Sequence, residues 1–149
     1  MTTIALNPQV VNPIEQLKTG VPPELMARKQ WVLWRVEPDS KGKPTKVPYT
    51  VKGWKASSTD PSTWSAFNEC VDAFDAGRYA GLGYMFAAND PYTGIDLDKH
   101  VTDDGMSAQA QVWLLELDSY SEYSPSGTGI HIIVKAKKPG TQCKNAVLG

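Results

Sequence analysis

Residues 93–98 of this chain read Thr-Gly-Ile-Asp-Leu-Asp, and this stretch decides how the centre of the sequence is interpreted. Its alternation predicts a β-strand with Asp96 and Asp98 on one face and Ile95 and Leu97 on the other. Two carboxylates on one open strand face suit a hard divalent cation such as Mg²⁺ or Mn²⁺. The stretch therefore predicts a strand that carries a candidate metal site.

A second motif lies at residues 124–131, which read Ser-Pro-Ser-Gly-Thr-Gly-Ile-His and predict a glycine-rich turn that leads into a strand. Hydroxyls and backbone N–H groups in such a turn suit oxyanions such as phosphates. On the strand at residues 129–136, Ile130 and Ile132 share one face, while His131 lies on the other and can donate to a phosphate oxygen. A metal site beside a phosphate site indicates nucleotide chemistry.

Further elements follow outward from these motifs. Strands are predicted at residues 30–36, 46–51, 81–87 and 120–123, and a helix at 107–117. Another helix is predicted from an N-cap at Asp60 to a C-terminal Gly77. The strands at 81–87 and 93–98 are close enough in sequence to form a hairpin. The order of elements predicts an α+β fold, with helices packed on one face of an antiparallel sheet.

Length and composition indicate the class of protein. A chain of 149 residues is one domain by length, and residues 1–20, which lack periodicity, are expected to form a flexible leader before a domain at 21–149. Cys70 and Cys143 make neither a disulfide framework nor a zinc set, so the expected location is the reducing cytoplasm. The sequence has no apolar run of membrane length and no visible secretory signal, so no association with a membrane is expected.

Charge is distributed unevenly along the chain. Residues 40–59 contain five lysines and no acid, residues 90–122 contain eight acids and one lysine, and residues 123–149 contain four lysines and no acid. An acidic centre between basic segments fits a metal-dependent site whose polyanionic substrate is held by the flanks. The alternative is that the lysine-rich loops are simply solvated.

The two motifs, together with the helix start SSTDPSTWSAF, resemble the primase-polymerase (prim-pol) domain of phage and plasmid replication proteins, within the archaeo-eukaryotic primase superfamily. The similarity runs from about residue 30 to residue 139. The resemblance implies a sheet like that of RNA-recognition (RRM) folds and a DNA primase or polymerase activity on nucleoside triphosphates. It implies that Asp96 and Asp98 bind the catalytic cations, and that Ser126, Thr128 and His131 hold the triphosphate of the incoming nucleotide.

The chain departs from the family pattern at one point. The family has a third metal-binding carboxylate on a strand after the His motif, and this sequence has no Asp or Glu after Glu122. Either the chain is truncated before that acidic motif, or it is a short relative with impaired catalysis. In both cases the isolated chain is expected to be a poor or inactive polymerase. If it does synthesise primers, Glu122 is the first candidate for the missing role.

The partners implied by the resemblance are nucleoside triphosphates, a single-stranded DNA template and a helicase domain downstream. Template contacts are predicted at Lys46, Lys52 and Lys55, with Trp54 as a base-stacking residue between them. The other four tryptophans are assigned to the core, and His100 to a structural or solvent-facing position rather than to a ligand role. The rival interpretation is a non-catalytic nucleotide- or single-stranded-DNA-binding module on the same fold.

Overall fold

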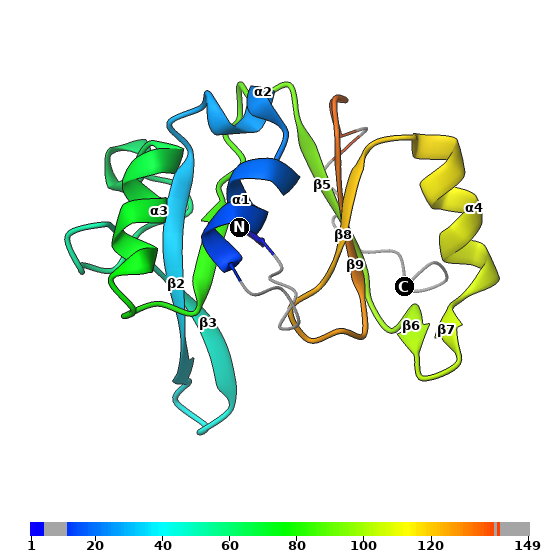
Figure 1. Cartoon of the computed structure of the whole chain (residues 1–149), viewed down its shortest axis with the longest axis horizontal. Coiled ribbons are helices and arrows are strands. Elements are labelled where there is room, and N and C mark those ends of the chain that lie inside the picture. Colours follow the sequence, from blue (N-terminus) through cyan, green and yellow to red (C-terminus); the bar gives the residue numbers. More distant parts are fainter. Residues whose placement is uncertain (5–11, 139, 141–149) are drawn as a thin grey trace. The chain divides into compact units, whose positions relative to one another are not determined.

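The computed structural model of this chain describes residues 1–4, 12–138 and 140. The chain divides into two compact units, which we call the first unit (Met1–Ala87) and the second unit (Ala88–Gly149). Each unit has its own antiparallel sheet and at least one helix (Figure 1). Among the described residues, no helix combines the length and the apolar character needed to cross a membrane.

The first unit is built on a four-stranded antiparallel sheet. In spatial order the strands are β1 (Thr2–Thr3), β4 (Gly81–Tyr84), β2 (Trp31–Pro38) and β3 (Pro44–Tyr49). Pro48 lies on β3 at the edge of this sheet, as expected for a residue that lacks a backbone N–H donor. The central strands are apolar on both faces, since residues 31–34 and 81–84 are all buried.

The helices of the first unit complete its core. They are α1 (Pro13–Gly20), α2 (Pro23–Met26), the 3₁₀ turn η1 (Pro61–Thr63) and α3 (Phe67–Asp75), of which α3 packs on β2 and β4. Trp31 is fully buried, with its ring edge-on to Phe67 at 5.0 Å and to Tyr84 at 5.3 Å. Its indole N–H donates to the Leu25 carbonyl at 2.9 Å, so the polar atom of this large side chain is also satisfied.

The interpretation of residues 1–20 as a flexible leader missed two elements among the described residues. Strand β1 pairs with β4, with Thr2 opposite Tyr84. Helix α1 begins at an N-cap formed by Asn12, whose side chain accepts from the backbone of Ile14 and Glu15, and Leu17 is buried. A two-residue strand and a helix with one buried leucine are too short to give a periodic pattern.

The helix predicted from Asp60 to Gly77 is divided in two. Asp60 does cap η1, through a bond from the backbone of Ser62 at 3.0 Å. The chain then becomes extended, because Ser65 exchanges two backbone hydrogen bonds with Trp31 on β2. Helix α3 starts afresh with Glu69 accepting from the Ala66 N–H at 2.8 Å, and Gly77 follows it in the left-handed conformation, as predicted.

The second unit has a three-stranded antiparallel sheet with β9 (Ile130–Val134) between β5 (Thr93–Leu97) and β8 (Tyr120–Tyr123). A two-stranded ladder of β6 (Val101–Thr102) and β7 (Gly105–Met106) leads into helix α4 (Ala108–Leu117). Ala110 of α4 packs with Leu97, Ile130 and Ile132 to form the core of this unit. The predicted apolar face of β9 is therefore the one that α4 covers.

The antiparallel α+β class is confirmed, but the strands are divided between separate sheets in two units instead of forming the one sheet that was predicted. The predicted hairpin between residues 81–87 and 93–98 is also wrong. Strand β4 is paired on both edges, with β1 and β2, and so has no free edge for β5. Strand β5 pairs with β9 instead. An RRM-like arrangement of prim-pol type stays a prediction.

Candidate active site

The acidic strand ends sooner than the sequence pattern indicated. Asp96 lies on β5, but β5 ends at Leu97, so Asp98 belongs to the turn that follows. Lys99 in that turn has a positive φ of 62°, which redirects the backbone away from the strand. Both aspartates are exposed at the same strand end, in a position to bind a ligand from solvent.

His131 stands at the centre of a row of side chains that crosses the second sheet. Asp96 on β5 and Glu122 on β8 are both directly opposite His131 on β9, and residues paired in this way project from the same face. The distances are 3.7 Å from His131 Nε2 to Asp96 Oδ1 and 3.7 Å from His131 Nδ1 to Glu122 Oε1. The prediction that His131 lies beside the acidic strand is therefore confirmed.

The three side chains of this row differ in access to solvent. The side chains of His131 and Glu122 are each 11% exposed, whereas that of Asp96 is 62% exposed. A ligand therefore meets Asp96 first, with His131 behind it and Glu122 on the far side of the imidazole ring.

Tyr120 fixes the position of Glu122. Its hydroxyl donates to Glu122 Oε2 at 2.6 Å, so the other carboxylate oxygen of Glu122 is the one directed to His131. Burial, together with the negative charge of Glu122, raises the pKa of Tyr120 well above its ordinary value, and the phenol remains a hydrogen-bond donor. From the sequence, Glu122 was predicted only as the first candidate to replace a missing third acid. Strand alternation places Tyr120 and Glu122 on one face, but only the register with β9 shows their target.

The glycine-rich turn packs directly against the end of the acidic strand. A Cβ atom at Gly129 would lie 2.8 Å from the Leu97 carbonyl oxygen and 3.7 Å from the Asp98 Cα, so only glycine permits this approach. The Val101 N–H donates to the Thr128 carbonyl at 3.0 Å and ties the turn to the segment after Asp98. The two sequence motifs thus meet at one end of β5.

Hydroxyl groups line the turn in a continuous chain. The Ser124 and Ser126 hydroxyls are 2.9 Å apart, and the Ser126 and Thr128 hydroxyls are 3.0 Å apart. Ser124 Oγ also accepts from the Gly129 N–H at 3.0 Å. Ser126 and Thr128 are exposed, so both hydroxyls are accessible to a ligand at this end of the strand.

The donor atoms at this strand end are of the kind that bind a hard divalent cation. Carboxylate oxygens of Asp96 and Asp98 are the hard ligands that Mg²⁺ and Mn²⁺ prefer, and Mg²⁺ commonly binds through one or two carboxylates plus substrate phosphates. In the parts of the chain that the structure describes, no group of three or more His, Cys, Asp or Glu side chains is arranged to hold a metal. The residues fit a cation that is coordinated jointly by the aspartates and a triphosphate, and this assignment stays a prediction.

The residues predicted to contact nucleic acid lie in the first unit, and they differ in whether other side chains of the chain already engage them. Lys46 donates to the Thr3 hydroxyl at 3.0 Å and lies 5.3 Å from the Trp34 ring. Lys55 is 3.9 Å from Glu37. Lys52 and Trp54 lie in the turn after β3, and Trp54 is 73% exposed.

The remaining aromatic and histidine assignments are confirmed. Trp31, Trp34 and Trp64 are buried, and Trp113 packs against the core of the second unit. His100 has a structural position, since its Nδ1 is 2.8 Å from the Ser107 hydroxyl that caps α4 and its ring packs edge-on against Trp113.

A comparison with known proteins decides the family. Over 114 residues the chain is 41% identical to the DNA primase-polymerase of Nitratiruptor phage NrS-1, a match that covers 74% of this chain. The resemblance to primase-polymerases is confirmed. The match covers only 15% of the phage primase-polymerase, so this chain corresponds to a small part of that relative's length. No family model matches the chain.

Proposed function

We propose that this chain is the nucleotidyl-transfer region of a DNA primase-polymerase that serves a phage or plasmid replicon in the cytoplasm. Its substrates would be nucleoside triphosphates, added to a growing strand on a single-stranded DNA template, with a helicase domain as partner. The observation that carries the proposal is the pairing of Asp96 with His131 across β5 and β9, with the Gly129 turn packed against the same strand end. The similarity to a phage primase-polymerase supports it.

Each side chain of the site has a role in this proposal. Asp96 and Asp98 would hold Mg²⁺ or Mn²⁺, which when bound supplies charge stabilisation to the transferring phosphoryl group and lowers the pKa of the attacking hydroxyl. Ser126 and Thr128 would donate to triphosphate oxygens from the turn. His131 would donate to a further phosphate oxygen from the sheet face, where its ring is flanked by carboxylates on both sides.

Glu122 is a positioning residue in this proposal. One of its carboxylate oxygens accepts from Tyr120, the other faces His131, and its side chain is largely covered. A carboxylate in this place orients the imidazole so that the opposite ring nitrogen, Nε2, faces the side of Asp96. Two-metal transfer needs more negative charge than Asp96 and Asp98 supply. We therefore expect slow but measurable synthesis by this chain alone.

Template-directed incorporation of labelled nucleotides in the presence of Mn²⁺ tests the proposal. The double variant Asp96→Asn/Asp98→Asn should reduce incorporation at least 100-fold, because neutral amides do not retain the cation. The matched control is Asp103→Asn/Asp104→Asn, which removes the same charge from the exposed β6–β7 turn and should leave the rate unchanged. Equal rates in the two double variants would reject the assignment of the site.

The second candidate function is a non-catalytic nucleotide- or single-stranded-DNA-binding module. The observation in its favour is that the described residues contain no group of three or more metal-binding side chains. This function gives a different result in the same experiment. The chain would show no incorporation under any condition, while cation-dependent triphosphate binding would be present in the control and lost in the Asp96→Asn/Asp98→Asn variant.

A further inference from the structure

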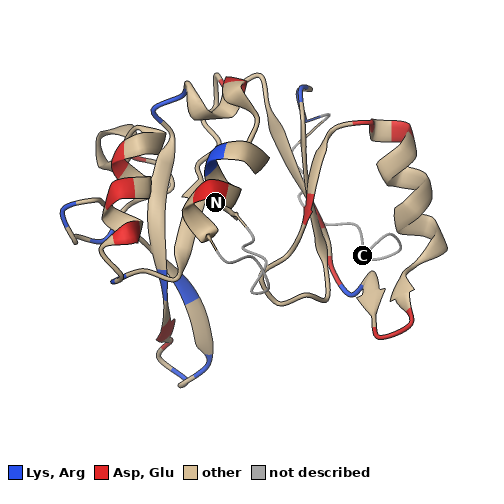
Figure 2. Ribbon diagram, in the orientation of Figure 1, with Lys and Arg blue, Asp and Glu red and all other residues tan. Residues whose placement is uncertain are grey.

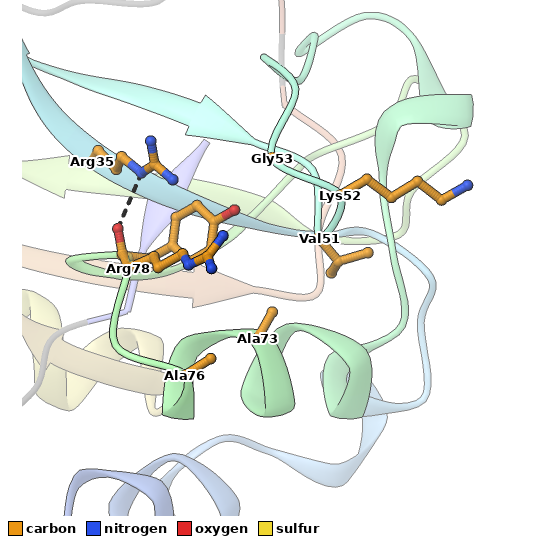
Figure 3. Close-up of a pocket in the computed structure, with 8 residues that line it drawn as sticks. Arg35, Val51, Lys52, Gly53, Ala73, Ala76 and Arg78 are labelled. Carbon is orange, nitrogen blue, oxygen red and sulfur yellow. Dashed lines mark hydrogen bonds between the residues drawn. The ribbon is translucent and has the colours of Figure 1, made fainter.

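The first unit contains a hollow of about 440 Å³ that the sequence motifs did not indicate (Figure 3). It lies between β2, the turn after β3, helix α3 and the loop that follows α3. Its floor includes the small side chains of Ala73 and Ala76. Its charged side chains are Arg35, Lys52 and Arg78, and no acidic residue lines it.

Arg35 is held in place before any ligand arrives. Its guanidinium carbon lies 4.5 Å from the centre of the Tyr49 ring and 4.6 Å from that of the Tyr79 ring. Its Nε donates to the Arg78 carbonyl at 3.0 Å, the dashed line in Figure 3. These contacts restrict the rotamers of Arg35, so that little conformational entropy is left to lose when its remaining N–H groups bind an anion.

The positive charge of the hollow is not compensated within the described residues. There, no carboxylate forms an ion pair with Arg35, Lys52 or Arg78. The acid closest along β2, Glu37, is engaged by Lys55 at 3.9 Å and by a hydrogen bond from the Tyr49 hydroxyl. Helix α3 does carry acids (Figure 2), but none of them lines the hollow. Cations that share a hollow repel one another, and a bound anion relieves that repulsion.

We propose that this hollow binds a backbone phosphate of a single-stranded nucleic acid. Arg35 and Arg78 would provide planar N–H donors, which match the geometry of a phosphate. Figure 3 shows that the Lys52 side chain extends away from the two arginines, so Lys52 would contact the strand at the rim of the hollow. The choice of a nucleic-acid strand as the carrier of the phosphate rests on the proposed function, whereas the preference for phosphate follows from the hollow itself.

Trp54 extends the site along the strand. The indole is 73% exposed, although Trp31, Trp34 and Trp64 of the same unit are buried. Its backbone is held by hydrogen bonds from the Thr50 N–H to the Trp54 carbonyl at 2.8 Å and from the Trp54 N–H to the Thr50 hydroxyl at 3.2 Å. A rigid turn thus presents an open aromatic face two residues after Lys52, where a base can stack while its phosphate lies in the hollow.

The test is fluorescence anisotropy of a labelled 20-nucleotide oligo-dT with the 149-residue chain, in the absence of nucleotide and divalent cation. Arg78→Ala should weaken binding about tenfold and reduce the slope of log Kd against log salt by about 0.7, the value for one contact on a single strand. Arg78→Lys should recover part of the salt dependence. Trp54→Ala should weaken binding about tenfold without changing that slope.

The control variant is Lys41→Ala, which removes one positive charge from the exposed turn between β2 and β3, outside the hollow. It should bind oligo-dT as the unmodified chain does. Equal weakening by Lys41→Ala and Arg78→Ala would overturn the proposal, because it would show a general charge effect. If Arg78→Ala abolishes binding of ATP but leaves binding of oligo-dT unchanged, the assignment of the hollow to a nucleic-acid strand is overturned. Circular dichroism of each variant checks that the fold is retained.

The outcome of the oligo-dT binding experiment does not depend on nucleotidyl transfer. If incorporation does not depend on Asp96 and Asp98 while oligo-dT binding still depends on Arg78, the proposed function is rejected and the strand site stands. If incorporation depends on Asp96 and Asp98 but oligo-dT binding is indifferent to Arg78 and Trp54, the function stands and the strand site is rejected.

Discussion

Both units of this chain pack a helix on an antiparallel sheet, but the two sheets have different roles. In the first unit, α3 covers a sheet whose central strands are buried on both faces, and large aromatic rings fill the core. In the second unit, α4 covers one face of a smaller sheet and leaves Leu115 81% exposed, and the other face carries Asp96, His131 and Glu122. The first unit has the larger core, while the second places ionisable side chains by strand register.

The same contrast holds for charge. The first unit gathers arginine and lysine around a hollow, while the second places carboxylates along a strand end and around the β6–β7 turn (Figure 2). A formal net charge of -1 for the whole chain conceals this separation. In our proposals the second unit binds the cation with the triphosphate and the first unit binds the nucleic-acid strand, so the two binding functions can be removed independently.

The largest effect is expected from Trp31→Ala in the first unit. Loss of a fully buried indole with its aromatic contacts and its hydrogen bond to Leu25 should reduce the free energy of unfolding by about 3–5 kcal/mol. Urea denaturation followed by circular dichroism measures it. Trp54→Ala is the matched control, and because Trp54 is exposed it should change that free energy by less than about 0.5 kcal/mol. Similar losses in both variants would contradict the packing described for this unit.

A smaller effect is expected from Ile132→Ala at the centre of the second sheet. Ile132 is fully buried in the cluster with Leu97 and Ala110, so its truncation should cost about 3 kcal/mol. Hydrogen exchange should show lost protection in β5, β8 and β9, while amides of β2 and β4 keep theirs. Equal loss in both sheets would show that the two units unfold as one cooperative structure.

Gly129→Ala should have an intermediate effect on stability and a clear effect on binding. The new methyl group would lie 2.8 Å from the Leu97 carbonyl oxygen, which is backbone, so the turn must move away from the strand end. We expect a cost of about 1–3 kcal/mol and weaker binding of triphosphate. Gly20→Ala, where the added atom meets nothing within 4 Å, should leave both unchanged. Unchanged triphosphate binding in Gly129→Ala would show that the turn does not contact the ligand.

The smallest effect concerns the pH dependence of Tyr120. Burial and the charge of Glu122 raise the pKa of Tyr120 above its ordinary value of 10.0. The folded state therefore binds a proton more tightly than the unfolded state, and the resulting stability is present below about pH 10 and is lost as pH rises above it. Tyr120→Phe should make the decline between pH 9 and pH 11 shallower, as measured by urea denaturation at each pH. A decline of the same slope would show that the phenol does not contribute.

The sequence predicted most of the helices and strands and the two motifs of the site, but not the features that depend on pairing between distant strands. Alternation correctly placed His131 opposite the apolar face of β9. The row of Asp96, His131 and Glu122 depends on the register of three strands, which local patterns do not encode.

The basic hollow was missed for a similar reason. Arg35 and Arg78 are 43 positions apart in sequence, so no local pattern links them. The fold brings them together, and Arg35 Nε donates to the Arg78 carbonyl. Lys46 was predicted from its place in a lysine-rich segment, yet the structure engages it with Thr3 and Trp34. A charge pattern along the sequence shows which segment is basic, but the fold decides which of its cations face a ligand.

The most direct test of the central claim is isothermal titration of dATP into the 149-residue chain with and without Mn²⁺. We expect binding that requires Mn²⁺, is weakened at least tenfold by His131→Ala, and is lost in Asp96→Asn/Asp98→Asn but kept in Asp103→Asn/Asp104→Asn. Deoxyadenosine, which lacks phosphates, should not respond to the His131 change. Equal affinity for dATP in the unmodified chain, His131→Ala and Asp96→Asn/Asp98→Asn would contradict the assignment of this strand end as the triphosphate site.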